Sequence, residues 1–140
     1  MIRISHLSAG YGEKTVLQDL TFSIEPGSVT TLVGPNGCGK TTLLRALTGQ
    51  LSQTAGEISI CGRELSSYSR KELARTVALL PQTRNTPDLT VEALVEHGRY
   101  PHLGFSRRLS EKDRQIVSRA MDQTDVAHLA HLPLGELSGG

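Results

Sequence analysis

The stretch at residues 34–42, GPNGCGKTT, decides the fold that this sequence predicts. It matches the pattern G-x-x-x-x-G-K-[ST], with a β-branched apolar run at residues 29–33 before it and a helix-forming run at residues 40–49 after it, which Gly49 is expected to stop. Glycines let the backbone N–H groups of such a loop turn inward around phosphate oxygens, because they carry no Cβ. The N-terminus of the following helix adds its dipole and its amides. The stretch therefore predicts a nucleoside triphosphate site between a buried strand and a helix.

The side chains of this loop predict two further roles. Lys40 supplies a positive charge toward the β- and γ-phosphates, and the Thr41 hydroxyl is placed to bind the Mg²⁺ that accompanies a nucleoside triphosphate. The other positions are expected to contact the nucleotide as the wall of the loop: Gly34, Pro35, Asn36, Gly37, Cys38, Gly39 and Thr42. A glycine-rich turn before an ordinary helix is the alternative, and the flanking strand and helix patterns disfavour it.

The residue pattern on either side of the loop divides the chain near Gln82. Residues 2–7 and 20–25 alternate and predict antiparallel strands, and residues 56–65 predict a short strand with a turn at Gly62. Residues 69–77 predict a helix and residues 77–82 a second buried strand. Two helices are expected at residues 90–99 and 110–123. The latter begins with a capping box at Ser110 and carries an apolar stripe of Ile116, Val117, Ala120 and Met121. We therefore expect a nucleotide-binding core with antiparallel β-structure at residues 1–82 and a helical subdomain at residues 83–140.

Composition excludes several classes of protein. A formal net charge of +1 over 140 residues does not favour nucleic acid as a partner. No secretory signal is visible, and no apolar run approaches the roughly 18 residues of a membrane span. Cys38 and Cys61 form no metal-binding or disulfide pattern, so two small buried thiols in a reducing compartment are expected. His128 and His131 are expected to be surface residues, which leaves nucleotide-bound Mg²⁺ as the expected metal.

Four stretches, in this order, resemble the ATP-binding subunits of ABC transporters: residues 10–49, 56–65, 77–82 and 136–140. The resemblance covers the whole chain and implies an α/β P-loop NTPase (RecA-like) core with an antiparallel β subdomain and a helical subdomain. It implies that Tyr11 stacks on adenine and that Gln82 senses Mg²⁺ and the attacking water. It also implies a signature motif at Leu137, Ser138, Gly139 and Gly140, which grips the γ-phosphate held by a second ATP-binding subunit in a head-to-tail dimer.

In the family that the sequence resembles, the signature motif precedes a helix, an apolar strand ending in Asp-Glu and a switch histidine. No Asp-Glu pair occurs in this sequence. We therefore expect the chain to correspond to the first half of a longer subunit, with the C-terminal part of the domain missing. The parent protein is expected to be a transport-coupled ATPase, and the isolated 140 residues to bind ATP without turnover.

Residues 95–104, VEHGRYPHLG, and residues 106–140 resemble the ATPases of iron-chelate (siderophore), haem and cobalamin importers. That resemblance implies uptake of an iron-siderophore or similar chelate, membrane permease subunits that dock around Arg99, Tyr100 and His102, and an indirectly coupled substrate-binding protein. It places the protein at the cytoplasmic face of the inner membrane. A haem or cobalamin importer is the alternative within the family. A soluble P-loop kinase or GTPase is the alternative outside it, although neither an acceptor-binding lid nor an N-K-x-D motif is visible.

Overall fold

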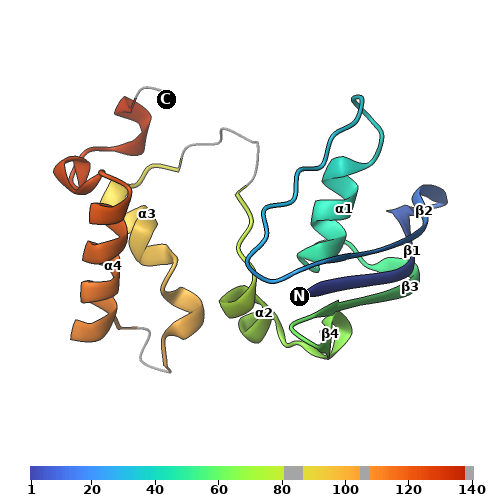
Figure 1. The fold of residues 1–140 in the computed structure, drawn as a ribbon. Helices are drawn as coiled ribbons and strands as arrows, with labels where there is room; N and C mark the ends of the chain where they lie inside the picture. The colour runs from blue at the N-terminus through green and yellow to red at the C-terminus, as the bar shows by residue number, and fades with distance from the viewer. Residues whose placement is uncertain (81–86, 105–107, 138–140) are drawn as a thin grey trace. The chain divides into compact units, whose positions relative to one another are not determined.

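The chain forms two compact units, Met1–Leu79 and Leu80–Gly140, and each is described here by itself (Figure 1). The computed structural model describes residues 1–80, 87–104 and 108–137. Within these ranges no helix has both the length and the apolar character that crossing a bilayer requires.

A four-stranded antiparallel sheet organises the first unit. Its strands are β1 (Ile2–Tyr11), β2 (Lys14–Ile24), β3 (Gln53–Ile60) and β4 (Arg63–Glu64), in the order β2-β1-β3-β4. The antiparallel strands expected at residues 2–7 and 20–25 are confirmed, and they pair with each other from Ile2 with Ile24 to Leu7 with Leu20. The turn expected at Gly62 is also confirmed, since Gly62 has φ 79 between β3 and β4. A positive φ there favours glycine.

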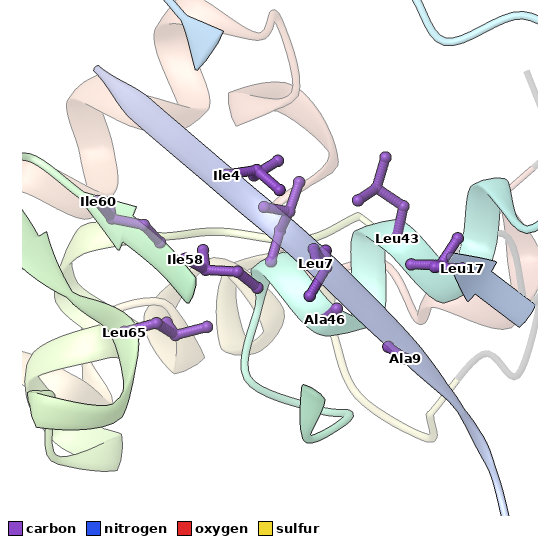
Figure 2. Packing of buried hydrophobic residues seen from close by; sticks show 10 residues of the cluster. Ile4, Leu7, Ala9, Leu17, Leu43, Ala46, Ile58, Ile60 and Leu65 are labelled. Atoms are coloured by element: carbon purple, nitrogen blue, oxygen red, sulfur yellow. The ribbon is translucent and has the colours of Figure 1, made fainter. Parts of the chain in front are cut away.

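Helix α1 (Lys40–Leu47) covers one face of this sheet. Figure 2 shows the side chains of β1, β3 and α1 meeting in one hydrophobic cluster, in which Ile4, Leu7 and Ile58 are essentially inaccessible. Each such side chain contributes roughly 1.5–3 kcal/mol by leaving water. Ala46 is also fully buried, and its small side chain lets the helix approach the strands closely. Helix α1 ends at Leu47, and Gly49, where the sequence predicted the stop, takes φ 67 just beyond it.

A short helical segment completes the first unit. It consists of the 3-10 turn η1 (Leu65–Ser67) and helix α2 (Arg70–Thr76), which confirms the helix expected at residues 69–77. Ser69 and Glu72 form a reciprocal capping box at the start of α2. The Glu72 carboxylate also accepts a 2.9 Å bond from Arg63, which together with Ser69 lowers the pKa of Glu72 to about 2.

The second unit is helical. It contains α3 (Val91–His97), η2 (Tyr100–His102), α4 (Glu111–Gln123), η3 (Ala127–Leu129) and η4 (Leu134–Glu136). The helices expected at residues 90–99 and 110–123 and the capping box at Ser110 are confirmed. The expected apolar stripe of α4 is only partly right, because Val117 and Met121 are buried while Ile116 is 38% exposed. Val117 and Met121 are one turn apart and face Val91 of α3, whereas Ile116 lies about 100° around the helix from Val117.

The two expected buried strands are wrong for the residues that the structure describes. Residues 25–39 form a long irregular stretch between β2 and α1 (Figure 1), in which Val29 is 98% and Val33 85% exposed. Residues 77–80 are likewise outside any strand, Leu80 is 95% exposed, and Pro81 and Gln82 lie beyond the described ranges. A β-branched apolar sequence favours a strand, but a strand forms only against a hydrogen-bonded neighbour. Neither segment has such a neighbour among the described residues.

Candidate functional site

The glycine-rich loop at residues 34–39 leads directly into α1, and its backbone requires glycine at specific points. Gly37 and Gly39 have φ 82 and φ 100, values that side chains other than glycine rarely adopt. Gly39 is also buried against β2: a Cβ there would lie 2.9 Å from Leu17 Cδ2 and 3.3 Å from Val16 Cγ1. This glycine therefore sets both the turn of the loop and the distance between the start of α1 and the sheet.

The N-terminus of α1 offers backbone donors without a competing side chain. Gly39 is the N-cap residue and contributes no side-chain cap, and the first turn contains no acidic residue. The first helical bond runs from Leu43 N to Gly39 O at 2.9 Å, so the N–H groups before Leu43 have no acceptor within the helix. Amides of this kind, at the positive end of the helix dipole, bind anions.

Lys40 supplies the positive charge at this end of the helix. Its Nζ donates to Gly34 O at 2.6 Å and to Pro35 O at 2.7 Å, and it lies 3.7 Å from Cys38 Sγ. The ammonium is thus held over the loop by carbonyl oxygens, which an anion with stronger acceptor oxygens can replace. The loop leaves no room for a larger residue at Gly34, since a Cβ there would lie 2.8 Å from Cys38 Sγ.

These features fit the phosphates of a nucleotide. The site combines backbone donors, one ammonium and a concave glycine backbone, which is the donor set that a polyphosphate requires. The Thr41 side chain, next to Lys40, is exposed and can offer its hydroxyl to a metal ion, whereas Thr42 is only 6% exposed. The buried Thr42 side chain instead lies close to Tyr11, whose pKa it lowers.

Tyr11 stands at the end of β1, beside α1. It is 44% exposed, and its hydroxyl accepts a 3.2 Å hydrogen bond from Arg45. Hydrogen bonding by Thr42, and then by Arg45, lowers the pKa of Tyr11 below its ordinary value. The structure therefore brings Tyr11 together with Thr42, two residues that the sequence predicted for the site. Arg45 is a third member that sequence reasoning did not identify.

Other expected site residues are not tested by the structure or lie elsewhere. Gln82, Ser138, Gly139 and Gly140 are outside the described residues. Leu137 is described, and it is partly buried against the hydrophobic cluster of Val91, Val117 and Met121.

The expectation of buried thiols is wrong, because Cys38 and Cys61 are both exposed. Cys38 belongs to the exposed part of the glycine-rich loop. Cys61 lies in the tight turn after β3, where it has φ 52 and its N–H donates to Met1 O at 2.9 Å. A position in a loop or turn exposes a side chain that would be buried in a strand, and the sequence alone did not distinguish the two.

The helical unit offers a different surface. Arg99 is largely buried and donates through Nε and a terminal nitrogen to Asp113 Oδ1, at 3.0 and 2.8 Å. Ser110 and this arginine lower the pKa of Asp113 to about 2. Tyr100 is 56% exposed, with its ring centroid 4.5 Å from that of His97. Of the residues expected to dock a partner, Tyr100 is thus available at the surface, while the Arg99 side chain is engaged within the unit.

Comparison with known proteins agrees with this geometry. A family model described as ABC transporter matches residues 17–140. The iron(3+)-hydroxamate import ATP-binding protein FhuC of Bacillus subtilis (strain 168) is 42% identical over 96% of the chain and 50% of its own length. The ferric enterobactin transport ATP-binding protein FepC of Escherichia coli (strain K12) is 42% identical over 99% of the chain and 52% of its own length.

A haem relative and a solved structure extend the comparison. The hemin import ATP-binding protein HmuV of Pseudomonas entomophila (strain L48) is 38% identical over 100% of the chain and 54% of its own length. An inward-facing structure of a putative metal-chelate type ABC transporter superposes with a TM-score of 0.80 at 27% identity, covering 99% of the chain and 50% of that structure's chain. The chain thus spans about half the length of the curated relatives it matches.

Proposed function

The chain belongs to the ABC transporter family, and from this membership we propose that it forms part of the ATP-binding subunit of an importer for an iron-siderophore or a similar metal chelate. The observation that carries the proposal is the loop at residues 34–39, which ends on an uncapped helix N-terminus with Lys40 held over its carbonyls. The relatives at 42% identity are named for iron(3+)-hydroxamate import and ferric enterobactin transport, which supports an iron chelate as cargo.

The residues of the loop are proposed to bind MgATP by exchanging one set of contacts for another. Lys40 leaves the carbonyls of Gly34 and Pro35 and pairs with the β- and γ-phosphate oxygens, while the first amides of α1 donate to the same phosphates. The Thr41 hydroxyl holds the Mg²⁺, and Tyr11 provides an aromatic surface for adenine. Bound MgATP supplies the phosphoanhydride bond whose hydrolysis drives transport.

The expected site residues outside the glycine-rich loop and Tyr11 keep the roles that the family resemblance implies. We propose that Gln82 senses Mg²⁺ and the attacking water. Leu137, Ser138, Gly139 and Gly140 are proposed to act on the nucleotide of a second ATP-binding subunit in a head-to-tail dimer. In this proposal residues 1–82 are the nucleotide-binding core and residues 83–140 the helical subdomain.

Partners and location follow from membership of an importer. We propose that the subunit binds integral membrane permease subunits at the cytoplasmic face of the inner membrane and works with a substrate-binding protein indirectly. The full-length subunit is proposed to hydrolyse ATP. The 140 residues by themselves are proposed to bind ATP without turnover, since their sequence contains no Asp-Glu pair to supply the general base.

Haem or cobalamin as cargo is the second candidate. One observation favours haem: a hemin import protein is 38% identical over the whole chain. The iron-siderophore proposal is preferred because the hydroxamate and enterobactin relatives are both 42% identical.

The experiment that tests the nucleotide proposal is a binding titration of MgATP against the 140-residue chain and its Lys40→Ala variant. We expect the variant to lose at least about tenfold in affinity, because a desolvated charge-assisted contact to phosphate is worth roughly 1.5–3 kcal/mol. Lys112→Ala is the matched control, because Lys112 is an exposed lysine in the helical unit. Equal affinities of wild type and Lys40→Ala would contradict the proposal.

A further inference from the structure

The contact between Arg45 and Tyr11 joins two elements at the candidate site. Tyr11 is the last residue of β1, and Arg45 lies in α1 one turn after Thr42, so that Thr42 and Arg45 share a face of the helix. Arg45 donates to the Tyr11 hydroxyl at 3.2 Å. Thr42, on the same face of the helix, also lowers the pKa of this phenol. Two residues of α1 thus act on the Tyr11 phenol, and Arg45 supplies the hydrogen bond to its oxygen.

This hydroxyl contact matters because the Tyr11 ring has little else to orient it. Among the described residues, Tyr11 belongs to neither hydrophobic cluster, and it is nearly half exposed. The hairpin turn that follows, at Gly12 with φ 57, fixes its backbone but not its side chain. The donor from Arg45 therefore determines where the ring lies relative to α1, the helix that follows the glycine-rich loop.

Arg45 is poorly placed to act on phosphates itself. It follows Lys40 by five residues, which corresponds to about 140° of rotation and about 7.5 Å of rise along an ideal α-helix. The Lys40 ammonium contacts the carbonyls of Gly34 and Pro35, whereas the Arg45 guanidinium contacts Tyr11. The two cations of α1 therefore contact different parts of the first unit, Lys40 the glycine-rich loop and Arg45 the end of β1.

We infer that Arg45 is a positioning residue, which holds the Tyr11 hydroxyl so that the ring is ready to receive the adenine of ATP. This inference rests on the proposed function. It specifies how the nucleotide site acquires affinity for a base in addition to phosphate: the helix that binds the phosphates also orients the aromatic surface for the base.

The experiment compares ATP with tripolyphosphate, which has phosphates but no base, as ligands of the 140-residue chain. We expect Arg45→Ala to weaken ATP about three- to tenfold, as loss of one hydrogen bond predicts, and to leave tripolyphosphate unchanged. Arg114→Ala removes the same charge from the helical unit and is expected to change neither. Loss of affinity for both ligands in Arg45→Ala would mean that the arginine acts through its charge and would overturn the inference.

A double-mutant cycle tests the contact itself. Tyr11→Phe removes the hydroxyl and keeps the ring, so Arg45→Ala should cost nothing further in ATP affinity in that background. Fully additive losses would overturn the inference. Ring signals of tyrosine, identified by their loss in Tyr11→Phe, provide a readout apart from binding. Because Arg45 is one of the groups that lower the pKa of Tyr11, Arg45→Ala should raise that pKa, and an unchanged pKa would also overturn the inference.

Failure of the inference and failure of the proposed function give different results. If Lys40→Ala leaves both ATP and tripolyphosphate binding unchanged, the proposed nucleotide site is wrong. If Lys40→Ala weakens both ligands while Arg45→Ala leaves the ratio of their affinities unchanged, the site stands and the positioning role of Arg45 is wrong.

Discussion

Substitution of Gly39 by alanine should destabilise the first unit more than the same substitution two residues earlier. Gly37 and Gly39 both have positive φ, 82 and 100, so each alanine pays for a left-handed backbone, about 1–2 kcal/mol. Around Gly37 there is nothing within 4 Å of a new Cβ. At Gly39 the Cβ would meet Leu17 Cδ2 at 2.9 Å and Val16 Cγ1 at 3.3 Å. Overpacking of this kind adds roughly 1–3 kcal/mol, so the total for Gly39→Ala is about 2–5 kcal/mol.

The assay is urea unfolding followed by circular dichroism, with Gly37→Ala as the matched control for backbone strain. We expect the free energy of unfolding of Gly39→Ala to lie at least about 1 kcal/mol below that of Gly37→Ala, the difference being the steric part. The ATP affinity of Gly39→Ala should fall as well, because the new side chain pushes the start of α1 away from β2. Equal unfolding free energies for the two variants would show that Leu17 and Val16 move aside at no cost and would refute the reasoning.

Four further expectations concern the thiols, the second unit, the core and the exposed apolar run. Cys38, in the loop beside Lys40, should be alkylated more slowly when MgATP is bound, whereas the alkylation rate of Cys61 should not change. Peptide mapping measures both rates, and an alkylation rate of Cys38 that MgATP does not lower would argue against nucleotide in the loop. Folding lowers the pKa of Asp113 from its ordinary 3.8 to about 2. The ionised carboxylate therefore stabilises the fold fully above about pH 4, and this stabilisation disappears as the pH falls through 2. Asp113→Asn should flatten this pH dependence in acid unfolding curves. Ile58→Ala, at a fully buried position, should lower the unfolding free energy by about 2–5 kcal/mol in chemical denaturation. Replacing Val29, which is 98% exposed, by lysine should reduce self-association in sedimentation experiments without lowering the melting temperature, and unchanged association would exclude residues 29–33 as the contact.

Local signals in the sequence predicted the local structure well. The capping residue Ser110, the helix stop at Gly49 and the turn at Gly62 were all identified, because each depends on the conformational preferences of a few adjacent residues. The glycines of the glycine-rich loop are local signals of the same kind. The loop pattern places glycine at residues 37 and 39, where φ is positive, and the structure adds that Gly39 also makes room for Leu17 and Val16.

Contacts between distant residues were not predictable from the sequence in the same way. The bond from Arg45 to Tyr11 depends on the register of the β1–β2 hairpin and on the packing of α1 against the sheet. No local pattern reports either quantity. The only available signal was the one-turn spacing of Arg45 from Thr42, which places both on one face of α1 but does not identify what that face contacts.

Residues 29–33 show why strand propensity and strand formation differ, and also what shapes the loop that follows them. Their sequence favours a strand, yet the backbone N–H and C=O groups of a strand need partners, and the described residues supply none. The loop at residues 34–39 nevertheless has its positive-φ glycines, its buried Gly39 and its Lys40 contacts. Packing of α1 fixes these features, because Leu43 and Ala46 of α1 lie in the hydrophobic cluster beneath the sheet and Gly39 packs on β2. The geometry of the candidate phosphate site therefore depends on how α1 packs against β1 and β2.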